Sequence, residues 1–148
     1  MLASRGYRVV ACDGSRRALL HARASITDAE SGSILFVEAD VEDWCFREAV
    51  FDLVVQVDFL DRRLFPLLRE CLRPGGLLFI DTFLDGGSPN AEGPSNIAFL
   101  LAPGEILSAF PDFDILLYEE KRAATSRATL LARKGFGRTA PGRGNRRG

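Results

Sequence analysis

The polar residues of this sequence that could bind a ligand stand at the ends of short apolar runs. Asp13, Asp40, Gln56 and Asp81 each end or closely follow a run that is typical of a buried β-strand. In an open α/β sheet, ligands bind beyond the carboxyl ends of the strands. We therefore expect these side chains to lie along one edge of a sheet and to form a binding site there.

Asp13 and Asp40 have the chemistry of a nucleoside site. A carboxylate at the end of an early strand can accept two hydrogen bonds from a ribose diol, and Gly14 beside Asp13 leaves room for a ligand to approach. Asp40 could accept a hydrogen bond from an adenine amino group, with Val41 beneath the ring. Two alternatives stay open, because Asp13 could instead cap the helix that begins at Ser15, and Asp40 could be a solvated loop acid.

The segments that would position these residues alternate between strand and helix. Ser15 is a suitable cap for the first helix, because its hydroxyl can accept a hydrogen bond from a first-turn backbone N–H. A second helix is predicted from Asp61 to Leu72, with Pro66 in its first turn, where a missing N–H costs little. The predicted strands over this part of the chain are Gly6–Asp13, Ile34–Glu38, Phe51–Val57 and Leu77–Phe83.

These strands are nearly continuous apolar runs, which is the pattern of a parallel sheet covered on both faces. After a short helix at Pro103–Phe110, two more strands are predicted at Phe113–Glu119 and Ala128–Arg133. The polar connection between these two strands is too short for a crossover helix, so the pair should be antiparallel. The expected fold class is therefore α/β, with a mostly parallel sheet and a terminal antiparallel pair.

The length of 148 residues allows one domain, which we expect to span residues 1–134. Residues 135–148 are rich in glycine and arginine, and we expect them to form a disordered basic tail. This tail holds four of the 19 basic residues, which leaves 15 basic against 20 acidic residues in the body. The resulting net charge of −5 on the body argues against nucleic acid as a partner.

Other classes of protein are excluded by further features of the composition. No apolar run reaches the ~18 residues of a membrane span, and no secretory signal opens the chain, so we expect a cytoplasmic protein without a membrane partner. The three cysteines are widely spaced and odd in number, which argues against a disulfide framework. The single histidine excludes a multi-histidine metal site, and we expect no metal.

Several stretches of the sequence together resemble the class I S-adenosylmethionine-dependent methyltransferases. The first three are GYRVVACDGS, VEADVEDWCF and FDLVVQVDFLDRRLFPLLRECLRPGGLLFIDTF. A later stretch, PSNIAFLLAPGEILSAFPDFDILLYEE, is similar to the tellurite-resistance-type branch, whose acceptors are small molecules. The resemblance extends over residues 1–134.

This resemblance implies a Rossmann-like sheet with the strand order 3-2-1-4-5-7-6 and S-adenosylmethionine as the cofactor. It places Asp13 and Gly14 at the ribose, Asp40 and Val41 at the adenine, and Gln56 near the methionine portion. The implied activity is methyl transfer to a small-molecule acceptor. Such enzymes usually need no covalent residue, because catalysis is largely the positioning of the acceptor in line with the methyl group.

The sequence departs from the family in that it holds no first strand and no glycine-rich G-x-G-x-G loop. It opens at LASRGY, which matches the end of the family's first helix, so we expect a domain truncated at its N-terminus. The absent strand belongs between the strands that end at Asp13 and Val57, and we expect a gap in the sheet there. We also expect weak or no cofactor binding by this chain alone, and association through exposed sheet edges.

Two other functions are compatible with the same residues. The chain could be a non-catalytic methyltransferase-like remnant that keeps the sheet and binds a partner. It could also be a nicotinamide-dependent oxidoreductase, for which Asp13 would serve equally well. The terminal antiparallel pair and the acid at Asp40 argue against the nicotinamide enzyme.

Overall fold

The structure is a computed structural model, which describes residues 2–27, 33–40, 47–86 and 93–136 of the chain. The chain divides into two compact units, which we call the N-terminal unit (Met1–Cys45) and the C-terminal unit (Phe46–Gly148). Each unit is described by itself. The predicted site residue Val41 and residues 137–148 of the predicted tail lie outside the described residues.

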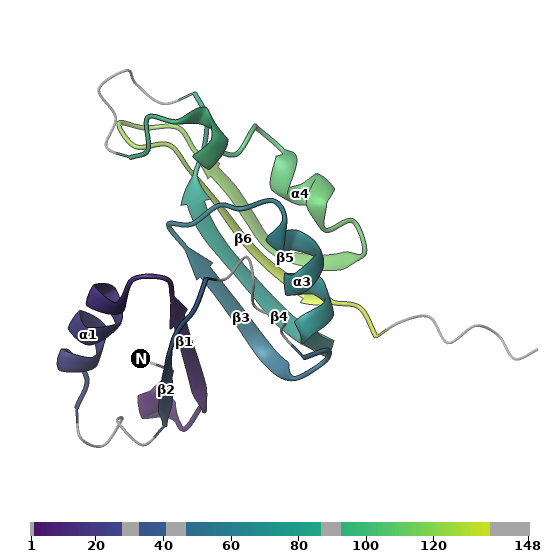
Figure 1. Cartoon of the computed structure of the whole chain (residues 1–148). Helices are drawn as coiled ribbons and strands as arrows, with labels where there is room; N and C mark the ends of the chain where they lie inside the picture. The colour runs from purple at the N-terminus through teal and green to yellow at the C-terminus, as the bar shows by residue number, and fades with distance from the viewer. Residues whose placement is uncertain (1, 28–32, 41–46, 87–92, 137–148) are drawn as a thin grey trace, which may run out of the picture. The chain divides into compact units, whose positions relative to one another are not determined.

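The N-terminal unit contains a two-stranded parallel sheet and one α-helix (Figure 1). The two strands pair in parallel, with Val9 opposite Ile34 at one end and Asp13 opposite Glu38 at the other. This pairing confirms the two parallel strands predicted for this part of the sequence. The elements in chain order are η1 (Ala3–Arg5), β1 (Val9–Asp13), α1 (Arg16–Ala24) and β2 (Ile34–Glu38).

The start of α1 follows the sequence-based prediction. Ser15 has an extended backbone, and its Oγ accepts a hydrogen bond from the Ala18 N–H at 3.3 Å, as expected of a helix cap. The helix ends at Ala24, where the Ser25 N–H and hydroxyl both donate to the Ala22 carbonyl. Serine favours such local hydrogen bonds over continued helix, so α1 is short.

The C-terminal unit contains a four-stranded mixed sheet with the strand order β3-β4-β6-β5. β3 and β4 are parallel, whereas β6 runs antiparallel to both β4 and β5. The predicted terminal antiparallel pair and the mostly parallel α/β architecture are therefore confirmed. The elements are β3 (Phe51–Val57), α3 (Leu64–Cys71), β4 (Leu72–Phe83), η2 (Ile97–Phe99), α4 (Glu105–Ala109), β5 (Phe113–Lys121) and β6 (Arg127–Lys134).

The first residues of β4 correct the predicted strand start at Leu77. Leu72 already pairs with Phe51, and the register then shifts before Leu77 pairs with Leu53. Gly76 is buried in this irregular stretch, where an added Cβ would lie 2.9 Å from the Arg73 carbonyl oxygen and 3.2 Å from that of Phe51. Glycine is therefore required here by the close approach of two backbone segments.

The core of the C-terminal unit lies between its sheet and two helices. Figure 1 shows α3 and α4 on the same face of this sheet. Alternate residues of β4 and β6 are buried, as expected for strands with one face against a core. Phe110 is fully buried, and its ring makes edge-to-face contacts with the rings of Phe65 and Phe113. Other buried side chains of this core are Leu64, Leu68, Leu78, Ile80, Ile106 and Leu130.

Among the described residues, the strands form two separate sheets, and the first and third strands do not pair with each other, as expected. Among these strands, β1 is hydrogen-bonded to β2 alone, and β3 is hydrogen-bonded to β4 alone. Within each sheet, the neighbouring strands are those that the resemblance implied. The expected strand order is therefore present in two parts.

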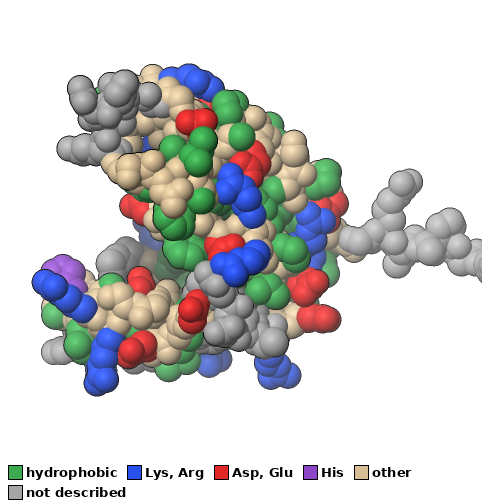
Figure 2. Space-filling model, turned by 45° about the horizontal axis from the view of Figure 1, so that its top comes forward, with side chains coloured by type: hydrophobic (Ala, Val, Ile, Leu, Met, Phe, Trp, Pro, Cys, Tyr) green, Lys and Arg blue, Asp and Glu red, His purple; other side chains and the backbone are tan. Residues whose placement is uncertain are grey.

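The surface mixes charges of both signs with apolar side chains. Figure 2 shows basic and acidic side chains interleaved over the visible face. Several of them form exposed ion pairs, such as Arg73 with Asp52 at 2.7 Å. Within the described residues, none of the helices has the length and apolar character needed to cross a membrane.

Candidate functional site

Asp13 is the last residue of β1, and its side chain is exposed. One of its two carboxylate oxygens takes part in the turn that follows. Its Oδ1 accepts a hydrogen bond from the Ser15 N–H at 2.7 Å, so the capping contact considered for Asp13 is present. Among the described residues, no donor is hydrogen-bonded to Oδ2. The carboxylate can therefore keep the turn with one oxygen and accept a ligand hydroxyl with the other.

Gly14 and Asp40 lie at the same edge of the small sheet as Asp13. The Ala39 N–H donates to the Asp13 carbonyl at 3.3 Å, which holds the chain after β2 against the end of β1. A Cβ added to Gly14 would meet only the Ala39 carbonyl oxygen, at 3.8 Å. Asp40 follows directly and is exposed. The N-terminal unit thus brings three of the predicted site residues to one edge of its sheet, with space beside Gly14.

Gln56 belongs to the C-terminal unit and has a structural contact of its own. Its side chain is 8% exposed, and its Nε2 donates to the Phe59 carbonyl at 2.8 Å. This hydrogen bond supports the turn that follows β3. The contact with a methionine portion that the resemblance implied for Gln56 remains a prediction.

A charged cluster at the carboxyl ends of β3 and β4 was only partly visible in the sequence. Arg127, the first residue of β6, donates from Nε to Asp81 at 2.6 Å and from Nη2 to Asp58 at 2.6 Å. The Thr129 hydroxyl donates to the other Asp81 oxygen at 2.6 Å. Burial lowers the pKa of Arg127, but the hydrogen bonds to the two carboxylates outweigh it and leave the pKa raised. Asp81 was among the predicted strand-end residues, whereas Asp58 and Arg127 were missed.

A second arginine fixes the loops near the same cluster. Arg62 donates from Nη2 to Glu105 at 2.8 Å, and it also donates to the carbonyls of Ala98 and Leu100, each at 2.9 Å. These bonds hold the η2 segment against the loop that follows β3. The two segments expose large apolar side chains, which are Phe59, Ile97 and Phe99.

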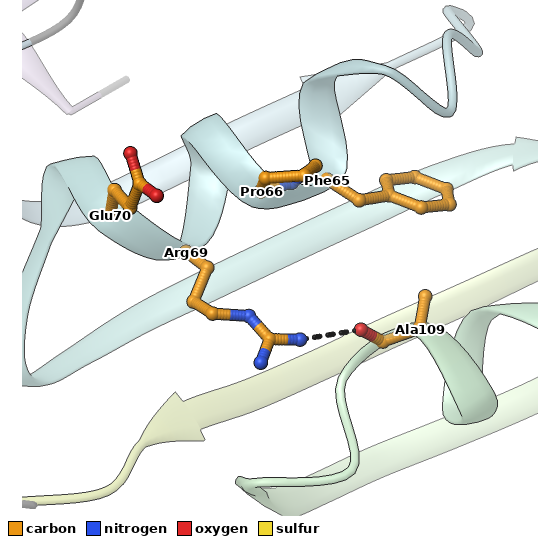
Figure 3. Close-up of a pocket in the computed structure, with 5 residues that line it drawn as sticks. All are labelled: Phe65, Pro66, Arg69, Glu70 and Ala109. Atoms are coloured by element: carbon orange, nitrogen blue, oxygen red, sulfur yellow. Dashed lines mark hydrogen bonds between the residues drawn. The ribbon is translucent and has the colours of Figure 1, made fainter.

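A cavity of about 340 Å³ is lined by residues of α3 and by Ala109 of α4 (Figure 3). Arg69 crosses it and donates to the Ala109 carbonyl at 2.7 Å, and it also pairs with Asp112 at 2.7 Å. The guanidinium lies 5.8 Å from the centre of the Phe110 ring. Arg69 therefore fastens α4 to α3, and none of the predicted site residues lines this cavity.

The comparisons with known proteins give a family from the sequence and a shared fold from solved structures. The family model described as "Methyltransferase domain" matches residues 1–76. No curated protein matches the chain in sequence. Three solved structures that share the fold are a SAM-dependent methyltransferase from Methanosarcina mazei, TehB from Haemophilus influenzae, and geranyl diphosphate C-methyltransferase from Streptomyces coelicolor.

These structural similarities are extensive, although the sequences have diverged. The Methanosarcina protein is 19% identical, with a TM-score of 0.70 over 92% of this chain and 86% of that one. TehB is 19% identical, with a TM-score of 0.71 over 90% of this chain and 52% of that one, so this chain spans about half of TehB. The Streptomyces enzyme is 14% identical, with a TM-score of 0.65 over 90% and 65%.

The predicted class I methyltransferase fold is thereby confirmed. The predicted cofactor, S-adenosylmethionine, also agrees with the comparisons, since the Methanosarcina protein is a SAM-dependent methyltransferase. The family match covers half of the chain and includes β1, β2 and β3, whose carboxyl ends carry Asp13, Asp40 and Gln56. The chain belongs to the family of methyltransferase domains.

Proposed function

We propose that this chain serves S-adenosylmethionine-dependent methyl transfer to a small-molecule acceptor. The observation that carries the proposal is the group formed by Asp13, Gly14 and Asp40 at one edge of the β1–β2 sheet, in a chain of the methyltransferase family. The accessible Asp13 carboxylate and the space beside Gly14 suit a nucleoside.

Each predicted residue has a role in this proposal. Asp13 Oδ2 accepts from a ribose hydroxyl, and Gly14 lets the ribose approach the backbone. Asp40 accepts from the adenine amino group, with Val41 against the ring, and Gln56 lies near the methionine portion. When bound, the cofactor supplies an electrophilic methyl group, so the residues of the chain have to orient an acceptor and exclude water.

The methionine end of the cofactor has few partners in this sequence. The 148 residues contain no G-x-G-x-G loop, and β1 and β3 each have one hydrogen-bonded neighbour among the described strands. We therefore assign the nucleoside half of the cofactor to the described residues, and we expect weak binding by this chain alone. Exposed strand edges of this kind favour association with another strand or chain.

The acceptor is proposed to be a small molecule of the cytoplasm. The Streptomyces relative is a geranyl diphosphate C-methyltransferase, which acts on a small molecule. The tellurite-resistance-type branch that the sequence resembles also has small-molecule acceptors. The acidic body argues against a nucleic-acid acceptor. Cys12 and Cys71 are free thiols, which suits a reducing compartment. The methyltransferase family match favours methyl transfer over the nicotinamide-dependent reaction.

Isotope-labelled methyl transfer tests this function. The full chain is incubated with S-adenosylmethionine that carries a trideuterated methyl group, together with a low-molecular-weight cell extract, and products are detected by mass spectrometry. We expect a trideuteromethylated small molecule that disappears with Asp13→Asn and persists with Glu38→Gln. Glu38→Gln removes an equal charge from the residue opposite Asp13. Cofactor binding without any labelled product would instead support the non-catalytic remnant.

A further inference from the structure

β3 lies at one edge of the four-stranded sheet and has backbone groups that point away from that sheet. Among the described strands, β3 is hydrogen-bonded to β4 alone. The Asp58 N–H donates to the Asp81 carbonyl at 3.0 Å, and in a parallel pair alternate residues of a strand direct their backbone groups to the same neighbour. The even-numbered residues of β3 therefore face β4. The N–H and C=O groups of Leu53, Val55 and Val57 face the outer side.

The two edge strands of this sheet differ in how well they resist pairing with another strand. Natural edge strands are protected by charged side chains, prolines or bulges. In β5 the register shifts between Ile115 and Leu117, and charged residues occupy four of its nine positions. β3 pairs without a shift from Leu53 onward, and Asp52 is the one charged residue among its seven. β3 is therefore the edge that can accept another strand.

The charge pattern of β3 suits an antiparallel copy of the same strand. With a twofold axis at Val54, Asp52 lies opposite Gln56 of the second copy, and no like charges are opposed within β3. A twofold axis at Val55 would instead place Asp52 opposite Asp58 of the second copy. A parallel pair in register would place the two Asp52 residues side by side. Repulsion between the carboxylates disfavours both of these alternatives.

The register centred on Val54 also brings the outward backbone groups together. Leu53 of one copy lies opposite Val55 of the other, and two such residues exchange a pair of hydrogen bonds. Val57 lies opposite Phe51 of the second copy, which makes a cross-strand pair of a β-branched and an aromatic side chain. Val55 and Val57 are each 49% exposed in the single chain, so this pairing would cover apolar surface.

We propose that a second copy of this chain pairs with β3 in antiparallel orientation, with Val54 at the twofold axis, so that two sheets join into one. The contact is formed by the C-terminal units. The inference goes beyond the proposed function, because it needs neither a cofactor nor a methyl acceptor. A contact of one short strand is smaller than a standard protein interface, so we expect a dimer that dissociates on dilution.

Sedimentation velocity of the full chain, without added ligand, measures this association. We expect a monomer–dimer equilibrium that shifts with protein concentration. Val55→Lys places a charge at the middle of the outer edge, where two copies lie diagonally across the interface, and should weaken dimerisation at least about tenfold. A chain that stays monomeric up to about 1 mM would overturn the proposal.

Leu117→Lys is the matched control for the lysine substitution. Val55 and Leu117 are 49% and 47% exposed, and they lie on the two opposite edge strands of the same sheet. We expect Leu117→Lys to leave the dimerisation constant unchanged. A dimer that Val55→Lys leaves intact, or one that both substitutions weaken equally, would place the interface elsewhere and overturn the proposal.

Cysteine cross-linking tests the register independently of the lysine variants. Val54→Cys places two cysteines directly opposite each other in a non-hydrogen-bonded pair, with Cα atoms about 4.5 Å apart, which is within the range for a disulfide. Val55→Cys is the control, because Val55 lies opposite Leu53 and its two copies are diagonal. Val55 is also the more exposed of the two residues, so random collisions would favour its cross-link.

The cross-link is identified after mild oxidation by mass spectrometry of the tryptic peptide 48–62, which contains no native cysteine. We expect the linked peptide from Val54→Cys in at least about tenfold higher yield than from Val55→Cys. Equal yields, or a higher yield from Val55→Cys, would overturn the antiparallel pairing centred on Val54. Because no cofactor is present in either experiment, failure of this inference leaves the proposed function unaffected.

Discussion

Two arginines organise the loops around the carboxyl ends of β3 and β4. Arg127 joins Asp58 to Asp81, and Arg62 joins the loop after β3 to Glu105. Arg127 lies 69 positions from Asp58, and Arg62 lies 43 positions from Glu105, so no local spacing reveals either contact. Side chains whose partners are local are easier to predict from sequence. Asp13 and Ser15, which hydrogen-bond within two or three positions, were identified in that way.

Replacing Arg62 should destabilise the C-terminal unit. Arg62→Gln loses the paired contacts with Glu105 and the bonds to two carbonyls, so we expect the free energy of unfolding to fall by about 1–2 kcal/mol, after allowing for partial exposure. Urea unfolding measures this change. Arg63→Gln is the control, because the Arg63–Asp61 pair is local and the arginine is well exposed, and it should change stability by less than about 0.5 kcal/mol. Equal losses in both variants would contradict the account.

The contact between Arg62 and Glu105 should make the stability of the C-terminal unit depend on pH. The hydrogen bond from Arg62 lowers the pKa of Glu105 below its usual 4.5, and partial burial opposes this shift. Because the folded-state pKa is lowered, the stabilisation is fully present above pH 4.5 and is lost as the pH falls through the folded-state pKa. Glu105→Gln should therefore be less stable than wild type at neutral pH and differ less from it in acid. A stability difference that stays constant from about pH 7 to about pH 3 would refute this.

Apolar patterning in the sequence identified most of the strands. The strands Ile34–Glu38 and Phe51–Val57 have the predicted bounds, and the last two strands are antiparallel as expected. The early start of β4 was not predictable, because Leu72 pairs with the distant Phe51 through a stretch whose proline and glycines indicate a turn. The composition of this stretch correctly indicates an irregular backbone. Its pairing depends on β3, which is distant in the sequence.

The irregular pairing between β3 and the start of β4 should require glycine at position 76. An alanine at Gly76 would place its Cβ within 3.2 Å of two backbone carbonyl oxygens, so we expect Gly76→Ala to lower the free energy of unfolding by about 1–3 kcal/mol. Gly14→Ala is the matched control for folding, because the nearest atom to its Cβ would lie 3.8 Å away. Thermal unfolding of both variants measures the difference. A normal melting temperature for Gly76→Ala would show that the strand start can shift to make room.

The buried residues that the structure describes are concentrated in the C-terminal unit. Among the described residues of the N-terminal unit, Ala3 is the only one that is buried. Its sheet has two strands, and α1 contains no buried residue. Two-stranded sheets are marginally stable by themselves. The lack of pairing between the first and third strands was expected from the sequence, but the unequal division of the core became visible only in the structure.

The rates of amide hydrogen exchange should differ between the two units. We expect the amides of β1 and β2 to exchange faster than those of β4 and β6, because few apolar contacts oppose local opening in the N-terminal unit. Mass spectrometry of the exchanging native chain measures both. Protection of β1 and β2 equal to that of β4 and β6 would mean that the two units unfold together. A ligand that binds at Asp13 should slow exchange in β1 and β2 in particular.

The central claim is that Asp13, Gly14 and Asp40 hold the nucleoside half of S-adenosylmethionine. The most direct measurement is a titration of the ¹⁵N-labelled chain with adenosylhomocysteine. We expect saturable shifts at the amides of Gly14 and Ala39, with a Kd weaker than micromolar because the glycine-rich loop is absent from these 148 residues. Asp13→Asn should weaken this binding about tenfold while Glu38→Gln leaves it unchanged. No saturable shift at Gly14 and Ala39, or an equal response of the two variants, would contradict the account.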